Sequence, residues 1–476
     1  MKRRQFVNLT TSTALAGVLA SAVPGYARNV FPAEYDKYGG WTGKKFKATG
    51  FFRVEKDQRW WIVTPEGNAF LSFGINHLYP DLFKGEHNFQ EWQKRLNLKD
   101  IQDYNKFQPA LRKWFLQTCQ DFGFNTIGCH NNLAITNNPK PQIAYVQKIT
   151  FVDIPHWRSE VPDENFVDVF SEDFASHCKA LSEKIVQKVK DDPFLLGYFM
   201  TDCPLFTEED CRERPDIIGG APRKSRVGWP NRLRNLGAEA PGKQAYVKVM
   251  TKLYDGQIIR FNETYDSSFS SFEDLLNAKE WRSKSDLSNA NERRDNIEFL
   301  KAVVDKYYQV SLNAIREFDK NHMFIGDKLN ANTDSIDTIL PTTSKHTDII
   351  MYQMYGRYDV QETGLDRWKN VVDKPFINGD SAFTMITEDM PRPYGPVADN
   401  LEQRAEWTKE FMENAFRRPE FVGWHYCGLI DATNKLARKR NRQHSGLLDQ
   451  YGKPYPLLQK EISQFTSKMY EVANGK

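Results

Sequence analysis

The sequence predicts an α/β protein built on a closed (β/α)8 barrel, the TIM-barrel class. After about residue 71, short apolar runs alternate with segments of helical spacing, which is typical of parallel strands joined by helices. About 450 residues remain beyond the N-terminal leader, which suits one elaborated barrel, because such barrels need ~250 residues and can exceed 400 with insertions. Two apolar runs end on carboxylates, Asp202 and Asp380, and catalytic groups of such barrels lie at the carboxyl ends of strands.

Residues 1–27 are predicted to be a cleaved leader. Arg3 and Arg4 precede an apolar, uncharged stretch over residues 9–23, the pattern of a signal peptide, and the arginine pair indicates the twin-arginine type. Cleavage is expected after Ala22 or Ala27. A membrane anchor is the less favoured alternative, because the apolar stretch is shorter than the ~20 residues that a spanning helix needs. The protein is therefore expected to be periplasmic or secreted, with no membrane span in the mature chain.

Residues 28–70 are predicted to form N-terminal strands that pack on the barrel. Two short apolar segments, 50–54 and 60–64, flank a polar turn, which is a β-hairpin pattern. A second turn at 65–68 leads into a buried strand over 69–77.

The barrel itself is assigned to residues 71–476. After the strand at 69–77, seven further strands are expected, separated by helical segments that include 110–122, 173–189, 299–318 and 401–416. The seven strands are 126–131, 149–154, 196–202, 322–327, 348–355, 375–381 and 421–426.

One long stretch, about residues 207–295, fits this alternation poorly and is interpreted as an insertion after strand 4. Because it follows the Asp202 strand, we expect an elaborated loop over the active face. It is either a solvated surface excursion or an anion-binding rim for a sulfated or carboxylated polysaccharide, since arginine forks match oxyanion geometry. The basic residues concerned are Arg212, Arg214, Arg223, Lys224, Arg226, Arg232 and Arg234.

Composition excludes several classes of protein. The formal charge of +3 gives no basic field of the kind that nucleic-acid binders show, whereas an aromatic fraction of 13% suits a sugar binder. The six cysteines contain no CxxC pair, and Cys203 with Cys211 is the closest pair for a disulfide. The histidines lack HExxH spacing, and no glycine-rich phosphate loop occurs, so no metal and no cofactor are expected. A zinc site assembled across several strands is the less favoured alternative.

The two strand-end carboxylates predict glycosidic bond hydrolysis, which needs one carboxyl group to protonate the leaving oxygen and another to attack or to activate water. Asp202 is predicted to be the general acid/base and Asp380 the nucleophile or water-activating base. Other polar or aromatic residues at strand ends are candidates to bind sugar, or are structural groups: Asn76, His77, His130, Asn131, Asp153, His156, Asp327, Lys328, Gln353, Tyr355, Trp424 and His425.

Several segments, in order along nearly the whole chain, resemble the agarase-like glycoside hydrolases, which include the family 50 beta-agarases. These segments are residues 60–67, 73–76, 168–171 with Phe174, 197–199, 445–449 and 452–455. The resemblance implies a (β/α)8 barrel, action outside the cytoplasm on red-algal galactans, and catalytic glutamates at the ends of the fourth and seventh strands.

The sequence departs from that pattern at both catalytic positions. Cys203 matches the acid/base glutamate, Asp202 its neighbouring asparagine, and Asp380 the seventh-strand glutamate. Each aspartate is one methylene shorter and withdraws its carboxyl group by up to roughly 1.5 Å. The gap could widen towards inverting spacing, or an Asp/Asp pair could still retain configuration. Cys203 is a poor general acid, since sulfur is a weak hydrogen-bond donor, and we expect it to be packed or disulfide-bonded.

Together these observations predict an exported glycoside hydrolase that cleaves agar-, porphyran- or carrageenan-type oligosaccharides with an Asp/Asp pair. The alternative is a catalytically inactive agarase-like protein that only binds carbohydrate. The expected partner is a neutral or sulfated oligosaccharide or polysaccharide, and not a nucleic acid.

Overall fold

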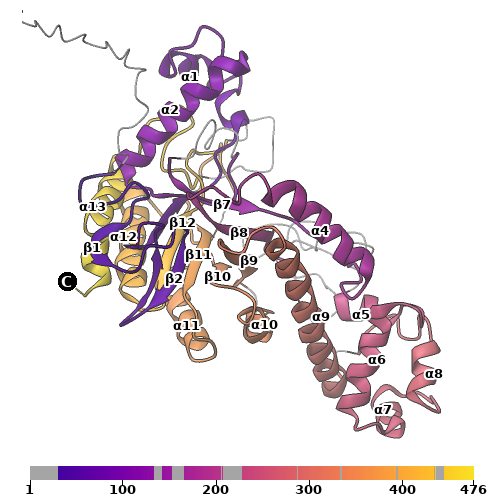
Figure 1. Ribbon diagram of the computed structural model, residues 1–476. Helices are drawn as coiled ribbons and strands as arrows, with labels where there is room; N and C mark the ends of the chain where they lie inside the picture. Colours follow the sequence, from indigo (N-terminus) through magenta and orange to yellow (C-terminus); the bar gives the residue numbers. More distant parts are fainter. Residues whose placement is uncertain are drawn as a thin grey trace, which may run out of the picture.

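The computed structural model describes residues 31–132, 142–152, 166–204, 206, 228–286, 288–332, 335–392, 395–433, 435 and 444–475. Eight parallel strands in chain order form a closed barrel, which confirms the predicted fold class (Figure 1). The barrel closes where β12 pairs with β5. The strands are β5 (Ser72–Ile75), β6 (Thr126–Ile127), β7 (Ala144–Lys148), β8 (Leu195–Asp202), β9 (Met323–Asn330), β10 (Ile350–Gln353), β11 (Phe376–Ser381) and β12 (Phe421–Tyr426).

An antiparallel sheet precedes the barrel. It has the order β1-β4-β3-β2, with β1 at Trp41–Lys45, β2 at Arg53–Lys56, β3 at Trp60–Val63 and β4 at Asn68–Phe70. Only Leu71 separates β4 from β5, so this sheet leads directly into the barrel. The backbone N–H of Trp60 donates to the carbonyl of Pro419 at 2.8 Å, which ties β3 to the turn before β12.

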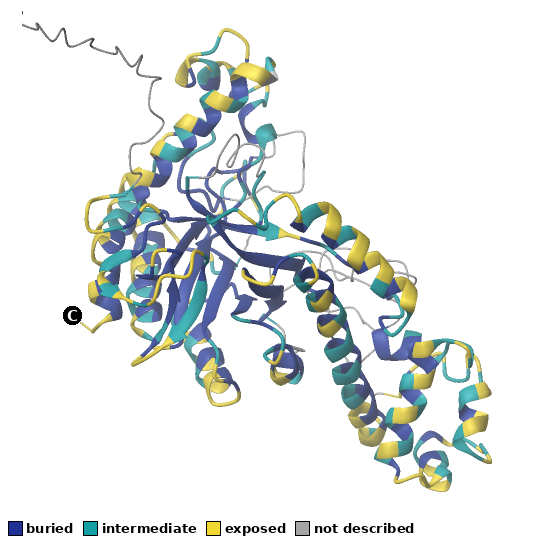
Figure 2. Ribbon diagram, in the orientation of Figure 1, coloured by how far each residue is buried: buried dark blue, intermediate teal, exposed yellow. Residues whose placement is uncertain are grey.

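Helices surround the barrel and bury their inner faces against it, while their outer faces stay exposed (Figure 2). None of the helices in the described part of the chain is long and apolar enough to cross a membrane, and the predicted leader lies outside the described residues. The helices outside the insertion are η1 (Pro80–Phe83), α1 (Phe89–Arg95), α2 (Tyr104–Phe122), α4 (Glu172–Val186), α9 (Ala290–Arg316), α10 (Ser335–Thr343), α11 (Tyr358–Lys369), α12 (Leu401–Arg417) and α13 (Pro456–Ala473).

The third barrel strand differs from the prediction. Ala144–Lys148 forms the strand, and not residues 149–154; residues 149–152 follow it without strand structure, and 153 and 154 lie outside the described residues. Two apolar runs adjoin here, and only the first pairs with both neighbours, β6 and β8. Apolar character alone does not distinguish a strand from the buried loop that continues it.

The insertion after strand 4 is also different from the elaborated loop that was predicted. Its described part forms four helices, α5 (Trp229–Arg234), α6 (Pro241–Leu253), α7 (Ile258–Tyr265) and α8 (Phe272–Asn277). They gather at the N-terminal end of α9, to one side of the barrel (Figure 1). The described part of the insertion therefore flanks the barrel and does not cover it.

Candidate active site

Asp202 and Asp380 come together at the carboxyl end of the barrel. Asp202 is the last residue of β8, the fourth barrel strand, and Asp380 lies near the end of β11, the seventh. The side chain of Asp202 is 24% exposed and that of Asp380 only 6%. One carboxylate is thus buried, and the other stands nearer to solvent.

Lys328, in β9, lies between these two carboxylates. Its Nζ is 2.8 Å from Oδ1 of Asp202 and 2.9 Å from Oδ2 of Asp380, and it donates to Nε2 of His130 at 2.8 Å. The contacts with His130 and Asp380 are hydrogen bonds, and the contact with Asp202 is an ion pair. Burial lowers the pKa of Lys328, but the two carboxylates outweigh burial and raise that pKa well above its usual value. The three charged groups carry a net charge of −1.

The shared lysine also limits the distance between the carboxylates. The two oxygens that face Nζ can lie no farther apart than 5.7 Å, the sum of their two distances from it. Retaining glycosidases hold their carboxyl groups about 5–5.5 Å apart, and inverting enzymes about 6.5–9.5 Å apart. The spacing of this pair therefore lies at the retaining end.

Two residues that follow β5 lie next to the other oxygen of Asp380, and one of them, Asn76, forms a hydrogen bond with it. Asn76 donates Nδ2 to Oδ1 of Asp380 at 2.9 Å and to the carbonyl of Gly379 at 2.8 Å. Nε2 of His77 lies 3.4 Å from the same Oδ1. Burial raises the pKa of Asp380, but Lys328 and His77 outweigh it and hold the pKa well below its usual value. Asp380 is accordingly a buried, ionised carboxylate with an oriented side chain.

The other two histidines predicted for the site, His130 and His425, are neutral, and they lie in different parts of the barrel. His130 stacks on His77 with ring centroids 4.8 Å apart; burial, followed by Lys328, lowers its pKa to about 4. His425 is fully buried inside the barrel, where its Nε2 lies 2.9 Å from Oγ of Ser72. Burial lowers the pKa of His425 to about 3. His130 therefore lines the site, and His425 lies inside the barrel, beside Gly74 and Gly128.

Three of the predicted sugar-binding residues do not reach the carboxylates. Asp327 accepts from the backbone N–H of Thr201 at 2.7 Å and from Tyr307 of α9 at 3.3 Å, so it faces the helices. Trp424 donates to Ser381 at 2.8 Å and packs on Phe411 of α12, so it forms part of the core and no stacking platform. The amide of Asn131 donates to the carbonyls of Ile75 and Gly128 and thereby holds a loop.

Gln353 and Tyr355 remain on the site side. Gln353 ends β10, and within the described residues its buried Nε2 has no hydrogen-bond partner. Tyr355 is buried beside Cys427, the residue directly after β12. Cys427 is not singled out by the sequence patterns, although its position one residue past a barrel strand is a usable signal. The same patterns place Lys328 at a strand end without predicting the contact with both carboxylates. Asp153 and His156 lie outside the described residues.

Cys203, which matches the acid/base glutamate of the resembling family, is packed in the interior of the protein. Cys203 is fully buried and forms no disulfide within the described residues, where its backbone N–H donates to the carbonyl of Lys328 at 2.9 Å. Cys211 lies outside those residues.

Arg234 is fully buried and pairs with Glu292 at 3.0 Å, so it is no part of an anion-binding rim. Arg232 lines a cavity of about 520 Å³ with acidic neighbours, Asp168 and Asp173. The other basic residues of the predicted rim, Arg212, Arg214, Arg223, Lys224 and Arg226, lie outside the described residues.

Comparison with known proteins confirms the resemblance to agarase-like proteins. Beta-agarase B of Vibrio sp. (strain JT0107) is 22% identical over 497 residues, which cover 91% of this chain and 50% of that protein. The chain therefore spans about half the length of the curated relative that it matches. No family model matches the chain.

Solved structures share the fold at low sequence identity. An exo-beta-agarase superposes with a TM-score of 0.71 at 19% identity, over 93% of this chain and 68% of that one. The agarase AgWH50C superposes at 0.70 and 18% identity, over 92% and 68% of the two chains. A beta-galactosidase from Halorubrum lacusprofundi is more distant, at 0.51 and 13% identity, over 84% and 58%.

Proposed function

We propose that this protein is a glycoside hydrolase that acts on agar-type galactan oligosaccharides, with Asp380 as nucleophile and Asp202 as general acid/base. The observation that carries the proposal is the placement of two carboxylates, from the fourth and seventh barrel strands, on one lysine at the carboxyl end of the barrel. The likeness to beta-agarases supports the choice of substrate class.

Asp380 has the properties of a nucleophile. It is almost fully buried and ionised, and Asn76 fixes the oxygen Oδ1 that Lys328 leaves unpaired. A carboxylate with a fixed orientation loses little freedom when it attacks the anomeric carbon, so positioning lowers the barrier. The short distance between the carboxylates supports a covalent glycosyl-enzyme intermediate and overall retention of configuration.

Asp202 is placed to exchange a proton with the leaving oxygen. It is the more exposed of the two groups, so an incoming sugar can reach it. The charge of Lys328 favours the ionised form of Asp202. When Asp202 takes up a proton, however, Lys328 still has Asp380 as its counterion. Protonation of Asp202 brings the net charge of the three groups from −1 to zero. The reactive form is thus Asp202 protonated, Lys328 charged and Asp380 ionised.

Hydrolysis of neutral and sulfated galactan oligosaccharides by single variants tests the proposal. Asp380→Asn and Asp202→Asn should each lower kcat by at least about 100-fold. Asp373→Asn is the matched control, because Asp373 is an exposed aspartate just before the same strand β11 and should leave the rate unchanged. Proton NMR of the first product should show that the new reducing end has the same anomeric configuration as the bond that was cleaved. Near-normal turnover in either site variant removes that residue from the mechanism.

A second candidate function is glycan binding without hydrolysis. Two observations favour it. Lys328 forms an ion pair with both carboxylates, and Cys203 stands where the resembling family has its acid/base glutamate. Calorimetry with the same oligosaccharides distinguishes the two functions. Binding by the wild-type protein with no product after prolonged incubation would establish the second one.

Export is proposed on the leader pattern of residues 1–27, with Arg3 and Arg4 as its twin-arginine pair. Expression of the full chain with an Arg3→Lys, Arg4→Lys variant as control tests this. We expect mature protein outside the cytoplasm for the wild type and cytoplasmic precursor for the variant. Equal export of both would refute twin-arginine transport.

A further inference from the structure

We propose that His77, Asp380 and Cys427 form a binding site for one thiophilic divalent cation, such as Zn²⁺, and that its occupancy blocks hydrolysis. The metal site stands on the geometry of these three side chains alone. Only the inhibition rests on the proposed function, because it requires Asp380 to be the nucleophile.

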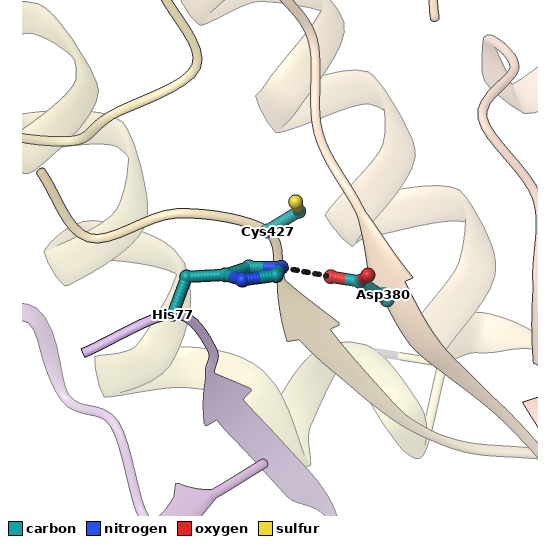
Figure 3. A group of neighbouring side chains, drawn as sticks. All are labelled: His77, Asp380 and Cys427. Carbon is teal, nitrogen blue, oxygen red and sulfur yellow. Dashed lines mark ion pairs between the residues drawn. The ribbon is translucent and has the colours of Figure 1, made fainter. Parts of the chain in front are cut away.

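The three side chains converge from neighbouring strands at the closure of the barrel. His77 follows β5, Asp380 lies in β11 and Cys427 follows β12, and these strands pair in the order β11-β12-β5. Their ligand atoms all lie within 4.8 Å of one another; the His77 and Asp380 side chains point toward each other, with Cys427 beside them (Figure 3). Backbone bonds hold the frame: His77 N–H donates to the His130 carbonyl, and Cys427 N–H to that of Ser381, both at 2.9 Å.

The contact between His77 and Asp380 has the length expected for two ligands of one ion. Nε2 of His77 lies 3.4 Å from Oδ1 of Asp380, and within the described residues this buried nitrogen has no hydrogen-bond partner. Two ligand atoms bound at about 2.1 Å to a tetrahedral ion are about 3.4 Å apart. His77 also has a left-handed backbone, with φ of 64°, which costs energy for a residue other than glycine.

Charge at the site matches a divalent cation. Asp202, Asp380 and Lys328 carry a net charge of −1, and Lys328 binds the other oxygen of Asp380, Oδ2. On binding, the Cys427 thiol releases its proton to solvent and a sulfur–metal bond forms. The site then carries −2, which the ion neutralises. Oδ1 of Asp380 keeps a second lone pair for its bond from Asn76.

The donor set defines the class of ion. One sulfur, one imidazole nitrogen and one carboxylate oxygen suit Zn²⁺, Co²⁺ or Cd²⁺, whereas Mg²⁺ and Ca²⁺ prefer oxygen ligands alone. The side chain of His77 is 25% exposed, so an ion can reach the site from solvent. Three protein ligands leave a fourth position for water.

Titration of the full-length, metal-free protein with Co²⁺ tests the site without any measurement of activity. We expect near-ultraviolet thiolate-to-cobalt absorption together with visible bands of tetrahedral Co²⁺, at one ion per chain. Cys427→Ser should abolish the thiolate absorption, and His77→Gln should weaken binding at least about tenfold. Cys129→Ser is the matched control, because Cys129 is another buried cysteine near Asp380 and should keep the absorption. Circular dichroism confirms that each variant is folded.

Absence of thiolate absorption in the wild type, or its persistence in Cys427→Ser, would overturn the proposed site. Zn²⁺ should inhibit oligosaccharide hydrolysis reversibly, with recovery by EDTA, and should inhibit Cys427→Ser at least about tenfold less strongly than the wild type. Cobalt absorption in the titrated protein, together with no hydrolysis by the metal-free protein, would refute the proposed function and leave the metal site standing. Hydrolysis without cobalt absorption would refute the metal site alone.

Discussion

Gly128 lies so close to Asn76 that a Cβ atom on Gly128 would fall 1.9 Å from Oδ1 of Asn76. Asn76 in turn donates to Asp380, so the small residue after β6 gives the proposed nucleophile its orientation. Gly128→Ala should displace the amide and lower kcat at least about tenfold, since misplacement of about 1 Å near the reacting atoms is costly. Steady-state kinetics on an agar-type galactan oligosaccharide measure this effect. Gly256→Ala, where no atom lies within 4 Å, is expected to reduce stability slightly through its φ of +73° and to leave kcat unchanged.

Lys328 should be essential because it is the counterion of two buried or half-buried carboxylates. Lys328→Met leaves both uncompensated and is expected to lower the free energy of unfolding by about 3–5 kcal/mol and to abolish hydrolysis. Adding Asp202→Asn to Lys328→Met should recover part of that free energy, since only one carboxylate then remains without a counterion. Denaturant unfolding of the single and double variants gives the interaction free energy between Lys328 and Asp202. Additive losses would show that Lys328 and Asp202 do not interact energetically.

Asp327 should make stability depend on pH. Burial raises its pKa to about 6, so the folded protein keeps this proton to higher pH than the unfolded chain, whose aspartates titrate near 3.9. The stabilisation is complete below about pH 4 and is lost as pH rises through 6. Asp327→Asn should therefore raise the free energy of unfolding by roughly 2–3 kcal/mol at pH 8 and change it little at pH 4. Urea unfolding at both pH values tests this, and an equal effect at both would contradict it.

The helical insertion should depend on the buried pair of Arg234 and Glu292. Both side chains are fully buried, 3.0 Å apart, and Arg282 contacts the other oxygen of Glu292. Arg234→Met removes one partner and is expected to cost about 3–5 kcal/mol. Arg260→Met, which breaks the exposed pair with Asp255, should cost at most about 1 kcal/mol. Thermal unfolding compares the two, and a similar shift in both would contradict the structural role of the buried pair.

Much of the fold was predictable, because its pattern is regular. Apolar runs separated by helical spacing indicated the barrel, its order and the placement of β8 and β11. The errors occurred where hydrophobicity is ambiguous. Residues 144–148 and 149–154 are neighbouring apolar runs, and only the pairing with β6 and β8 selects the first. The insertion lacks the alternation of apolar runs and helical segments that marks the barrel, yet it forms its own small core around residues such as Phe261 and Trp281.

The site was predictable to the level of strand ends and no further. Successive residues of a strand face opposite sides, so a strand end offers neighbours of which only one can enter the barrel. Lys328 enters it and Asp327 faces α9; His425 enters it and Trp424 faces α12. A shift of one residue in register would exchange these roles, and a single sequence does not reveal the register. The bridge from Lys328 to both carboxylates depends on the same register.

Closure of the barrel by β12 against β5 also has a consequence for biosynthesis. Ser72 and His425, which meet across that seam, are 353 positions apart in the chain, and Asn76 and Asp380 are 304 apart. Contacts of such long range form slowly, because much of the chain must be ordered before they can be made. In a nascent chain that has not yet reached residue 421, β5 and β11 are edge strands with unpaired backbone groups, and such edges can pair with other chains. The barrel therefore cannot close before β12 has been translated, and the yield of active protein should depend on how far other proteins protect those edges until then.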